Sequence, residues 1–116
     1  MKVLMILNDP PYGTERSYNG LRLAGSIVKQ EETEVKVFMI GDAASCAKKG
    51  QIVPRGYYNI ESMSTGISRE GGEIGVCGSC MEARGITKEE LLDGARPSSM
   101  DELTQWSVWA DKVLVF

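Results

Sequence analysis

The sequence predicts an α/β fold, a three-layer α/β/α sandwich around a mainly parallel, five-stranded sheet. The first observation is that short, continuously apolar runs, typical of strands buried on both faces, recur along the chain. The second is that amphipathic helical segments separate these runs, as parallel crossovers require. The third is the length of 116 residues, which suits one domain over 1–116 without repeats, low-complexity tracts or linkers.

The first strand is expected at residues 3–7, a continuous apolar run that stops at a turn-forming segment, residues 8–13. Thr14 is the expected N-cap of the first helix, because its hydroxyl can accept a backbone N–H of the first turn. Four residues of that helix share one face: Leu21, Ala24, Gly25 and Val28. The second strand is expected at residues 34–40, and a short helix over 43–49 follows it.

An irregular stretch, residues 51–59, contains a pair of tyrosines, Tyr57 and Tyr58. We interpret this pair equally as a pocket wall, a subunit contact or an isolated patch of surface aromatics. Asn59 is the expected N-cap of the next helix, which a pair of glycines ends. The third strand is expected at residues 74–76.

Two capping-box patterns, at residues 87–90 and 99–102, predict helices in the last third of the chain. Between them, residues 95–98 are expected to form a short edge strand, because Pro97 cannot donate to a ladder. Three residues line one face of the last helix: Leu103, Trp106 and Ala110. An apolar strand at residues 112–116 ends the chain.

The composition excludes several classes of function. The net charge is −3 and the chain has no Lys/Arg cluster, which argues against a nucleic-acid surface. The apolar run at residues 3–7 is too short for a signal peptide, and no run is long enough for a membrane span, so we expect a cytoplasmic protein. The chain has no histidine, which excludes Cys-His catalysis, Ser-His triads and zinc sites with an imidazole ligand.

Two of the three cysteines form a C-x-x-C pair, Cys77 and Cys80, directly after the third strand. Cys77 is expected at the carboxyl end of that strand, where open α/β sheets place their chemistry. If the next turn is helical, the amides around residues 78–80 point at Cys77 and favour its thiolate. A structural zinc site needs about four ligands, which three sulfurs without imidazole do not supply, so we expect no metal. Cys46 is interpreted as a buried packing thiol.

The cysteine pair is compatible with two kinds of chemistry, besides being a coincidence of sequence. A C-x-x-C pair at a helix start is the layout of a dithiol oxidoreductase, in which Cys77 attacks and Cys80 resolves. The Gly-Ser between the cysteines and the element order both differ from those of thioredoxins. Alternatively, Cys77 carries sulfur as a persulfide, which requires an exposed thiol of lowered pKa but no strong base.

We expect the walls of the thiol pocket to come from two other segments. The loop after the first strand lies beside the carboxyl ends of the neighbouring strands. It contains Asn8, Asp9, Tyr12 and Gly13. Arg84 lies about two helical turns after Cys77 and either adds positive charge to the pocket or only interacts with the helix C-terminus. The loop lacks glycine-rich phosphate-binding motifs, so we expect no nucleotide or flavin cofactor.

Several segments together show a resemblance to a known family. They are residues 11–15, 19–24, 56–60, 77–86, 105–106 and 110–114. With these segments the chain resembles, over nearly its whole length, the DsrE/DsrF-like family, in particular its YchN-like branch, which is related to TusD-type sulfur-relay proteins. The resemblance implies a flavodoxin-like sandwich, a cytoplasmic protein that forms trimers or hexamers, and no metal or organic cofactor.

The resemblance also implies a function. The better-understood relatives pass sulfane sulfur along cysteine persulfides, in intracellular sulfur oxidation and in sulfur relay to tRNA thiolation, between sulfur-donor and sulfur-acceptor proteins. Their relay cysteine falls on Cys77 of this sequence. Those relay subunits usually lack a second cysteine at the position of Cys80, so here a disulfide-forming side reaction is also open.

Three hypotheses follow. The first is a persulfide carrier or sulfurtransferase in which Cys77 accepts and donates sulfur and Cys80 resolves or protects it. The second is a dithiol-disulfide oxidoreductase, and the third is a non-catalytic oligomeric binding module. We also expect homo-oligomers, because so small a domain does not readily bury four large aromatic residues on helix faces and loops. These residues are Tyr57, Tyr58, Trp106 and Trp109.

Overall fold

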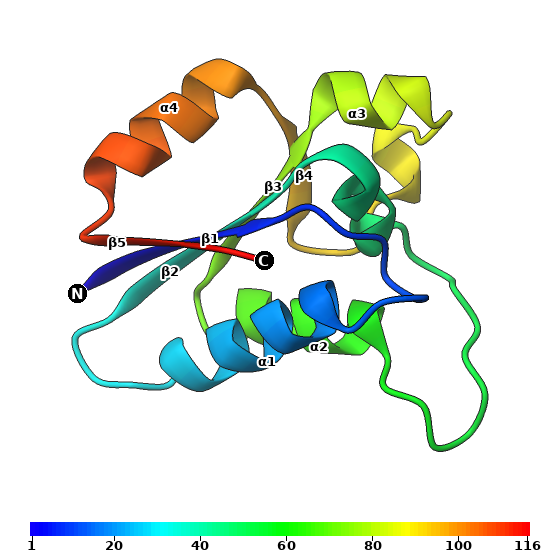
Figure 1. Ribbon diagram of the computed structural model, residues 1–116, viewed down its shortest axis with the longest axis horizontal. Coiled ribbons are helices and arrows are strands. Elements are labelled where there is room, and N and C mark those ends of the chain that lie inside the picture. Colours follow the sequence, from blue (N-terminus) through cyan, green and yellow to red (C-terminus); the bar gives the residue numbers. More distant parts are fainter.

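Five strands form one fully parallel sheet in the computed structural model, which describes all of residues 1–116 (Figure 1). The strand order is β4-β3-β2-β1-β5. The bounds are Lys2–Leu7 for β1, Glu34–Met39 for β2, Glu73–Cys77 for β3, Ala95–Ser98 for β4 and Lys112–Val115 for β5. Every neighbouring pair is parallel, so the predicted α/β fold with its parallel sheet is confirmed.

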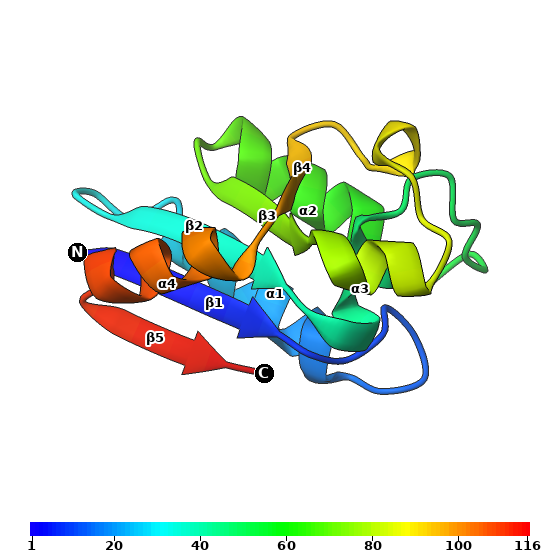
Figure 2. The same ribbon diagram turned by 90° about the horizontal axis from the view of Figure 1, so that it is seen from above.

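Helices cover both faces of this sheet, as Figures 1 and 2 show. Helices α1 (Arg16–Ile27) and α2 (Ile60–Arg69) lie side by side on one face, and α4 (Met100–Trp109) crosses the other. Strands β1 to β4 advance in one direction across the sheet, whereas β5 returns to the far side of β1. Because parallel crossovers are right-handed, this reversal places α4 on the opposite face from α1 and α2. None of the helices combines the length and apolar composition needed to cross a membrane.

Three short segments follow β2 and β3. They are the 3-10 helices η1 (Gly41–Ala47) and η2 (Lys88–Glu90) and the single short α-helix α3 (Gly78–Ala83). Strands β2 and β3 are neighbours, and their register pairs Met39 with Val76. As a result, η1 and α3 start side by side at the carboxyl edge of the sheet and pack against each other (Figure 2).

A small apolar cluster fills the space between the sheet and α4. It consists of Leu4, Phe38, Cys77, Leu103 and Trp106. The ring of Trp106 meets the ring of Phe38 edge-on, with centroids 6.0 Å apart and an interplanar angle of 88°. Aromatic quadrupoles favour this arrangement. The thiol of Cys77 is therefore part of the packing on the α4 side of the sheet, while a larger core lies on the α1/α2 side.

The predicted caps of α2 and α4 are confirmed. Asn59 and Ser99 cap these helices, each accepting a hydrogen bond from a backbone N–H of the first turn. The prediction for Thr14 is wrong, because Glu15 occupies the cap position of α1. From one residue earlier, the hydroxyl of Thr14 accepts the backbone N–H of Arg16 at 3.4 Å and donates to the carboxylate of Asp9 at 2.9 Å.

Two segments expected as helices are 3-10 helices. The one expected at residues 43–49 is η1, which begins and ends earlier, and the one expected from residues 87–90 is the single turn η2. The capping box of η2 is present as predicted. Just beyond it, however, the backbone N–H of Leu92 donates to the carbonyl of Ala47 at 2.8 Å. This tertiary hydrogen bond holds the chain extended and overrides the local helix preference.

The aromatic residues behind the expected oligomerisation are better packed than the sequence indicates. Trp106 is only 4% exposed. Trp109 lies beneath the ammonium group of Lys36, with 4.5 Å between Nζ and the ring centroid. Tyr58 stacks on a neighbouring tyrosine ring, with 3.9 Å between centroids. Of the four aromatic residues, only Tyr57 is fully exposed, so oligomerisation requires a different argument.

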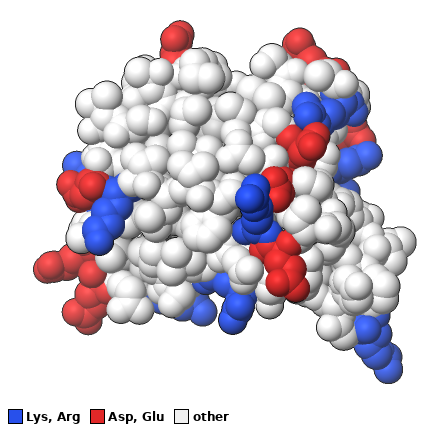
Figure 3. All heavy atoms as spheres, in the orientation of Figure 1, with Lys and Arg blue, Asp and Glu red and all other residues white.

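Exposed apolar side chains lie instead along β5 and at the end of α4. Val108 is 84% exposed, Val113 43% and Val115 63%. In the orientation of Figure 1, β5 lies nearest the viewer, and Figure 3 shows that charged side chains surround a broad uncharged centre on this side. Because β5 is an edge strand, its outer backbone groups are also available to pair with another strand.

We propose that copies of this chain associate through the β5 edge. Val115→Lys should then convert an oligomer into a 12.7 kDa monomer, because an unpaired ammonium group is costly to bury in an apolar contact. Light scattering coupled to size-exclusion chromatography measures the mass. Ile52→Lys, which alters a 97% exposed residue outside this edge, is the matched control and should leave the mass unchanged. A wild-type protein that is monomeric at micromolar concentration contradicts the proposal.

Gly75→Ala should destabilise the fold, because a Cβ there lies 3.0 Å from Cη2 of Trp106 and 3.2 Å from Cβ of Ser98. We expect the free energy of unfolding to fall by about 1–3 kcal/mol, the usual cost of overpacking. Urea denaturation measures it. Gly66→Ala in α2, where a Cβ meets nothing within 4 Å, is the control and should stabilise by up to about 1 kcal/mol. An unchanged Gly75→Ala variant would show that Trp106 is loosely packed.

Candidate functional site

Cys77 is the last residue of β3, at the carboxyl edge of the sheet. Its side chain packs in the apolar cluster next to α4, and the residue is only 9% exposed. Its Sγ lies 3.3 Å from Oγ of Ser79. The thiol therefore combines an apolar surrounding on one side with a polar contact to the first residues of α3 on the other.

Opposing influences set the pKa of Cys77. Burial is the largest single influence, and it raises the pKa because it disfavours the charged thiolate. Hydrogen bonds from the side chains and backbone amides of Cys80 and Ser79 act in the other direction and together outweigh burial. The pKa of Cys77 consequently lies below its ordinary value, without a histidine in the chain to act as a base.

Cys80 has the complementary role. It is half-buried, and its Sγ accepts the backbone N–H of Gly41 at 3.2 Å. Burial raises the pKa of Cys80, and the hydrogen bond from its thiol to Cys77 raises it further. The Gly41 amide and the positive charge of Arg84 lower the pKa but only in part, so it stays above its ordinary value. The two thiols are therefore shifted in opposite directions, with the pKa of Cys80 above and that of Cys77 below the ordinary value.

Arg84 connects α3 to η1. Its Nη1 donates to the backbone carbonyl of Cys80 at 3.1 Å, and its Nη2 pairs with Oδ1 of Asp42 at 2.7 Å. The guanidinium thus binds a carbonyl of α3, one of the two roles considered from the sequence, and its charge lowers the pKa of Cys80. Both partners of the ion pair retain solvent contact, so the pair contributes at most about 1 kcal/mol to stability.

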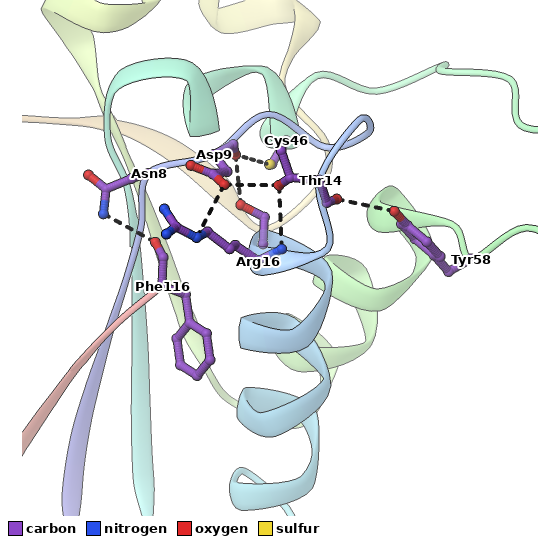
Figure 4. A network of polar contacts seen from close by, with 8 residues as sticks. Asn8, Asp9, Thr14, Arg16, Cys46, Tyr58 and Phe116 are labelled. Atoms are coloured by element: carbon purple, nitrogen blue, oxygen red, sulfur yellow. Dashed lines mark hydrogen bonds and ion pairs between the residues drawn. The ribbon is translucent and has the colours of Figure 1, made fainter.

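Asn8 and Asp9 begin the loop after β1 (Figure 4). Nδ2 of Asn8 donates to the carbonyl of Phe116 at 3.1 Å and ties the loop to the end of the chain. The Asp9 carboxylate accepts the hydroxyl of Thr14. Neither side chain hydrogen-bonds to the thiol pair. The backbone of Asn8 does lie near Gly41, whose N–H contacts Cys80. A Cβ added to Gly41 would be 3.8 Å from the Asn8 carbonyl oxygen.

Tyr12 and Gly13 lie further along the same loop, towards α2. The Tyr12 hydroxyl accepts the backbone N–H of Ile60 at 3.2 Å. Gly13 has a φ of +103°, a left-handed conformation that favours glycine. Gly13 also lines a hollow of about 400 Å³ together with Tyr57 and Tyr58. The tyrosine pair therefore forms a pocket wall, which is one of the interpretations left open by the sequence.

Cys46 is fully buried within η1. Its thiol donates to the backbone carbonyl of Asp9 at 3.5 Å, a contact drawn in Figure 4. Burial raises the pKa of Cys46 to about 12, so this thiol stays protonated. These features agree with its interpretation as a packing thiol, and they show that it also fastens the first loop to η1.

Three residues that contact the thiol pair or its arginine were not predicted from the sequence: Gly41, Asp42 and Ser79. A signal for the first two was present. Gly41 follows the second strand closely, and the carboxyl ends of adjacent parallel strands meet at one edge of a sheet. Once β2 is placed next to β3, the start of η1 must lie beside the cysteine pair.

The chain is similar to known proteins over its whole length. The whole chain, residues 1–116, matches the DsrE/DsrF-like family. Protein YchN of Escherichia coli is 35% identical over 116 residues, which cover 99% of this chain and 98% of that protein. An uncharacterized protein of Methanopyrus kandleri is 33% identical over 114 residues, which cover 98% of this chain and 93% of that protein.

Solved structures give the same result. The crystal structure of Escherichia coli YchN matches 100% of this chain and 99% of its own with a TM-score of 0.94 at 35% identity. A protein of unknown function from Methanobacterium thermoautotrophicum shares the fold, with a TM-score of 0.76 at 11% identity over 99% of this chain and 98% of its own. The chain therefore belongs to the DsrE/DsrF-like family, and within it to the YchN-like branch.

Proposed function

We propose that the protein handles sulfur in the cytoplasm and carries sulfane sulfur as a persulfide on Cys77. One observation supports this most strongly: Ser79 and Cys80 hydrogen-bond to the Cys77 sulfur and favour its thiolate at the carboxyl edge of the sheet. Membership of the DsrE/DsrF-like family, which is associated with sulfur relay, adds support. The three cysteines are all free thiols, the form that a reducing compartment maintains.

The proposed transfer requires neither a cofactor nor an oxidant. The Cys77 thiolate attacks the outer sulfur of a donor persulfide, and a new S–S bond forms at Cys77 while the S–S bond of the donor breaks. The donor leaves as a thiolate and accepts a proton from solvent. In the second half of the cycle, a thiolate of an acceptor protein attacks the outer sulfur on Cys77 in the same way, and Cys77 leaves as a thiolate.

The remaining predicted site residues are assigned supporting roles. Arg84 acts on the thiol pair through Cys80 and holds α3 against η1 through Asp42. The first loop acts through its backbone, because Cys46 of η1 donates to the carbonyl of Asp9. In this proposal none of the four predicted loop residues touches sulfur. Asp9 is bonded to η1, while Asn8 bonds to Phe116 and Tyr12 to Ile60. Gly13 supplies the left-handed turn of the loop.

A second candidate function is a dithiol-disulfide oxidoreductase. The observation that favours it is that Cys77 ends β3 and Cys80 lies in the first turn of α3, and that each thiol shifts the pKa of the other. In that reaction both thiols lose their protons and two electrons pass to a disulfide substrate as the Cys77–Cys80 bond forms. Turnover that survives in Cys80→Ser would exclude this function and leave the persulfide carrier.

Incubation with glutathione persulfide should add the mass of one sulfur atom to the protein. We expect tandem mass spectrometry to locate this atom on Cys77, because the lower pKa of Cys77 makes its thiolate the more abundant nucleophile of the pair. Cys46→Ser, which keeps a donor for the Asp9 carbonyl, should load like wild type, since Cys46 is fully buried. The proposal fails if wild type gains no sulfur under conditions that load a known persulfide carrier, or gains it only on Cys80.

Alkylation of Cys77 by iodoacetamide should reach half its maximal rate at a pH below about 8.5, the ordinary pKa of cysteine. The hydrogen bonds favour the thiolate, so Cys77 deprotonates at lower pH and its reactivity is lost only as the pH falls through this lowered pKa. Ser79→Ala removes one of these hydrogen bonds and should move the midpoint upward. Peptide-resolved mass spectrometry separates Cys77 from Cys80, and a wild-type midpoint at or above 8.5 would contradict the thiolate assignment.

A further inference from the structure

The two thiols of the pair differ in accessibility. Cys77 is 9% exposed and packs against the rings and side chains of the cluster next to α4. Cys80 is half-buried and lies one turn further along α3, at the boundary between the two apolar clusters. A persulfide on a peptide or protein must approach in line with the bond that breaks, which requires space around the attacking sulfur. Cys80, the outer thiol, offers more of that space than Cys77, the inner thiol.

Two contacts offset part of the cost of charge on the outer thiol. The backbone N–H of Gly41 donates to Cys80 Sγ at 3.2 Å, and the guanidinium of Arg84 contacts the carbonyl of the same residue. Both contacts stabilise negative charge on Cys80, when it attacks a donor and when it leaves, and without them burial would raise its pKa further.

We propose that Cys80 is the receiving thiol of the pair: sulfur from a peptide- or protein-bound persulfide passes to Cys80 first and from there to Cys77. This inference rests on the proposed function and adds a defined order to it. It assigns the half-buried sulfur to contact with partners and the enclosed sulfur to storage. The enclosed position keeps a bound persulfide away from other thiols and from water.

The first step is an exchange in which no net oxidation occurs. Cys80 transfers its proton to the Cys77 thiolate, and the resulting Cys80 thiolate attacks the outer sulfur of the donor persulfide. A bond forms between Cys80 Sγ and this outer sulfur, the S–S bond of the donor breaks, and the donor departs as a thiolate. Because each thiol shifts the pKa of the other, the proton can pass between them without an external base.

The second step moves the sulfur inward. Cys77 loses its proton again to solvent or to the departing donor, and its thiolate attacks the outer sulfur on Cys80. A bond forms between Cys77 Sγ and the transferred sulfur as the bond from that sulfur to Cys80 Sγ breaks. Cys80 leaves as a thiolate stabilised by the Gly41 amide and the Arg84 charge. Cys80 then regains a proton. Delivery to an acceptor reverses both steps, so atoms and electrons balance throughout.

The test is a rapid-quench time course with glutathione persulfide as the probe. In wild type, we expect sulfur to appear on Cys80 before it accumulates on Cys77. Cys80→Ser should slow the loading of Cys77 by a factor of about ten or more, because it removes the intramolecular step. Serine keeps an O–H donor toward Cys77, so alkylation of Cys77 by the much smaller iodoacetamide should change little. This second readout separates loss of the receiving thiol from loss of the Cys77 thiolate or of the fold.

Two further variants sharpen the result. Cys77→Ser should accumulate sulfur on Cys80, because the second step is blocked. Arg84→Gln should lengthen the lifetime of the Cys80 persulfide relative to wild type, since the leaving thiolate loses its cation. Cys46→Ser, which removes a fully buried thiol but keeps a donor for the Asp9 carbonyl, is the matched control and should follow the wild-type course.

The possible outcomes distinguish this inference from the proposed function. Equal loading of wild type and Cys80→Ser overturns the receiving role and leaves the persulfide carrier intact. A wild type that gains no sulfur at all overturns the proposed function itself. A Cys77–Cys80 disulfide with release of hydrosulfide as the main product overturns both and favours the dithiol oxidoreductase.

Discussion

The parallel pairing of β2 with β3 is the constraint on which the rest of the site depends. Its register places Met39 beside Val76, so both strands end at the same level. The chain then turns into η1 on one strand and into α3 on the other, and the Gly41 amide meets the Cys80 sulfur. Residues 39 positions apart in the sequence come together because two central strands share one edge, as in other open α/β sheets.

A thiolate without a histidine partner requires many small contributions. Burial next to Phe38 and Trp106 opposes the charge, and hydrogen bonds from Ser79 and Cys80 outweigh it. The balance also explains why the neighbouring thiol behaves differently, since Cys80 donates its own proton and is left with the higher pKa of the two. Two identical functional groups three positions apart thus have pKa values shifted in opposite directions by their surroundings.

Much of the fold and part of the site could be predicted from the sequence. Apolar runs located four of the five strands, and the caps at Asn59 and Ser99 were correct, because these signals are local. The features that were missed depend on how segments pack together. Thr14 lies one residue before the cap position of α1, and the ring of Trp106 is buried against Phe38 of β2. The amide of Gly41 could not be assigned to Cys80 without knowing which strands are neighbours.

The segments that carry the two thiols are held in place to different degrees. Cys77 belongs to a central strand that is paired on both sides and packed beneath α4. Cys80 belongs to a six-residue helix, too short to be stable alone, whose position depends on Met81 in the core and on weak contacts to η1. Local opening costs least in such a segment, because few buried contacts are lost. In the proposed function, the sheltered sulfur of Cys77 therefore belongs to a well-packed strand, and the more accessible sulfur of Cys80 belongs to a short helix with few buried contacts.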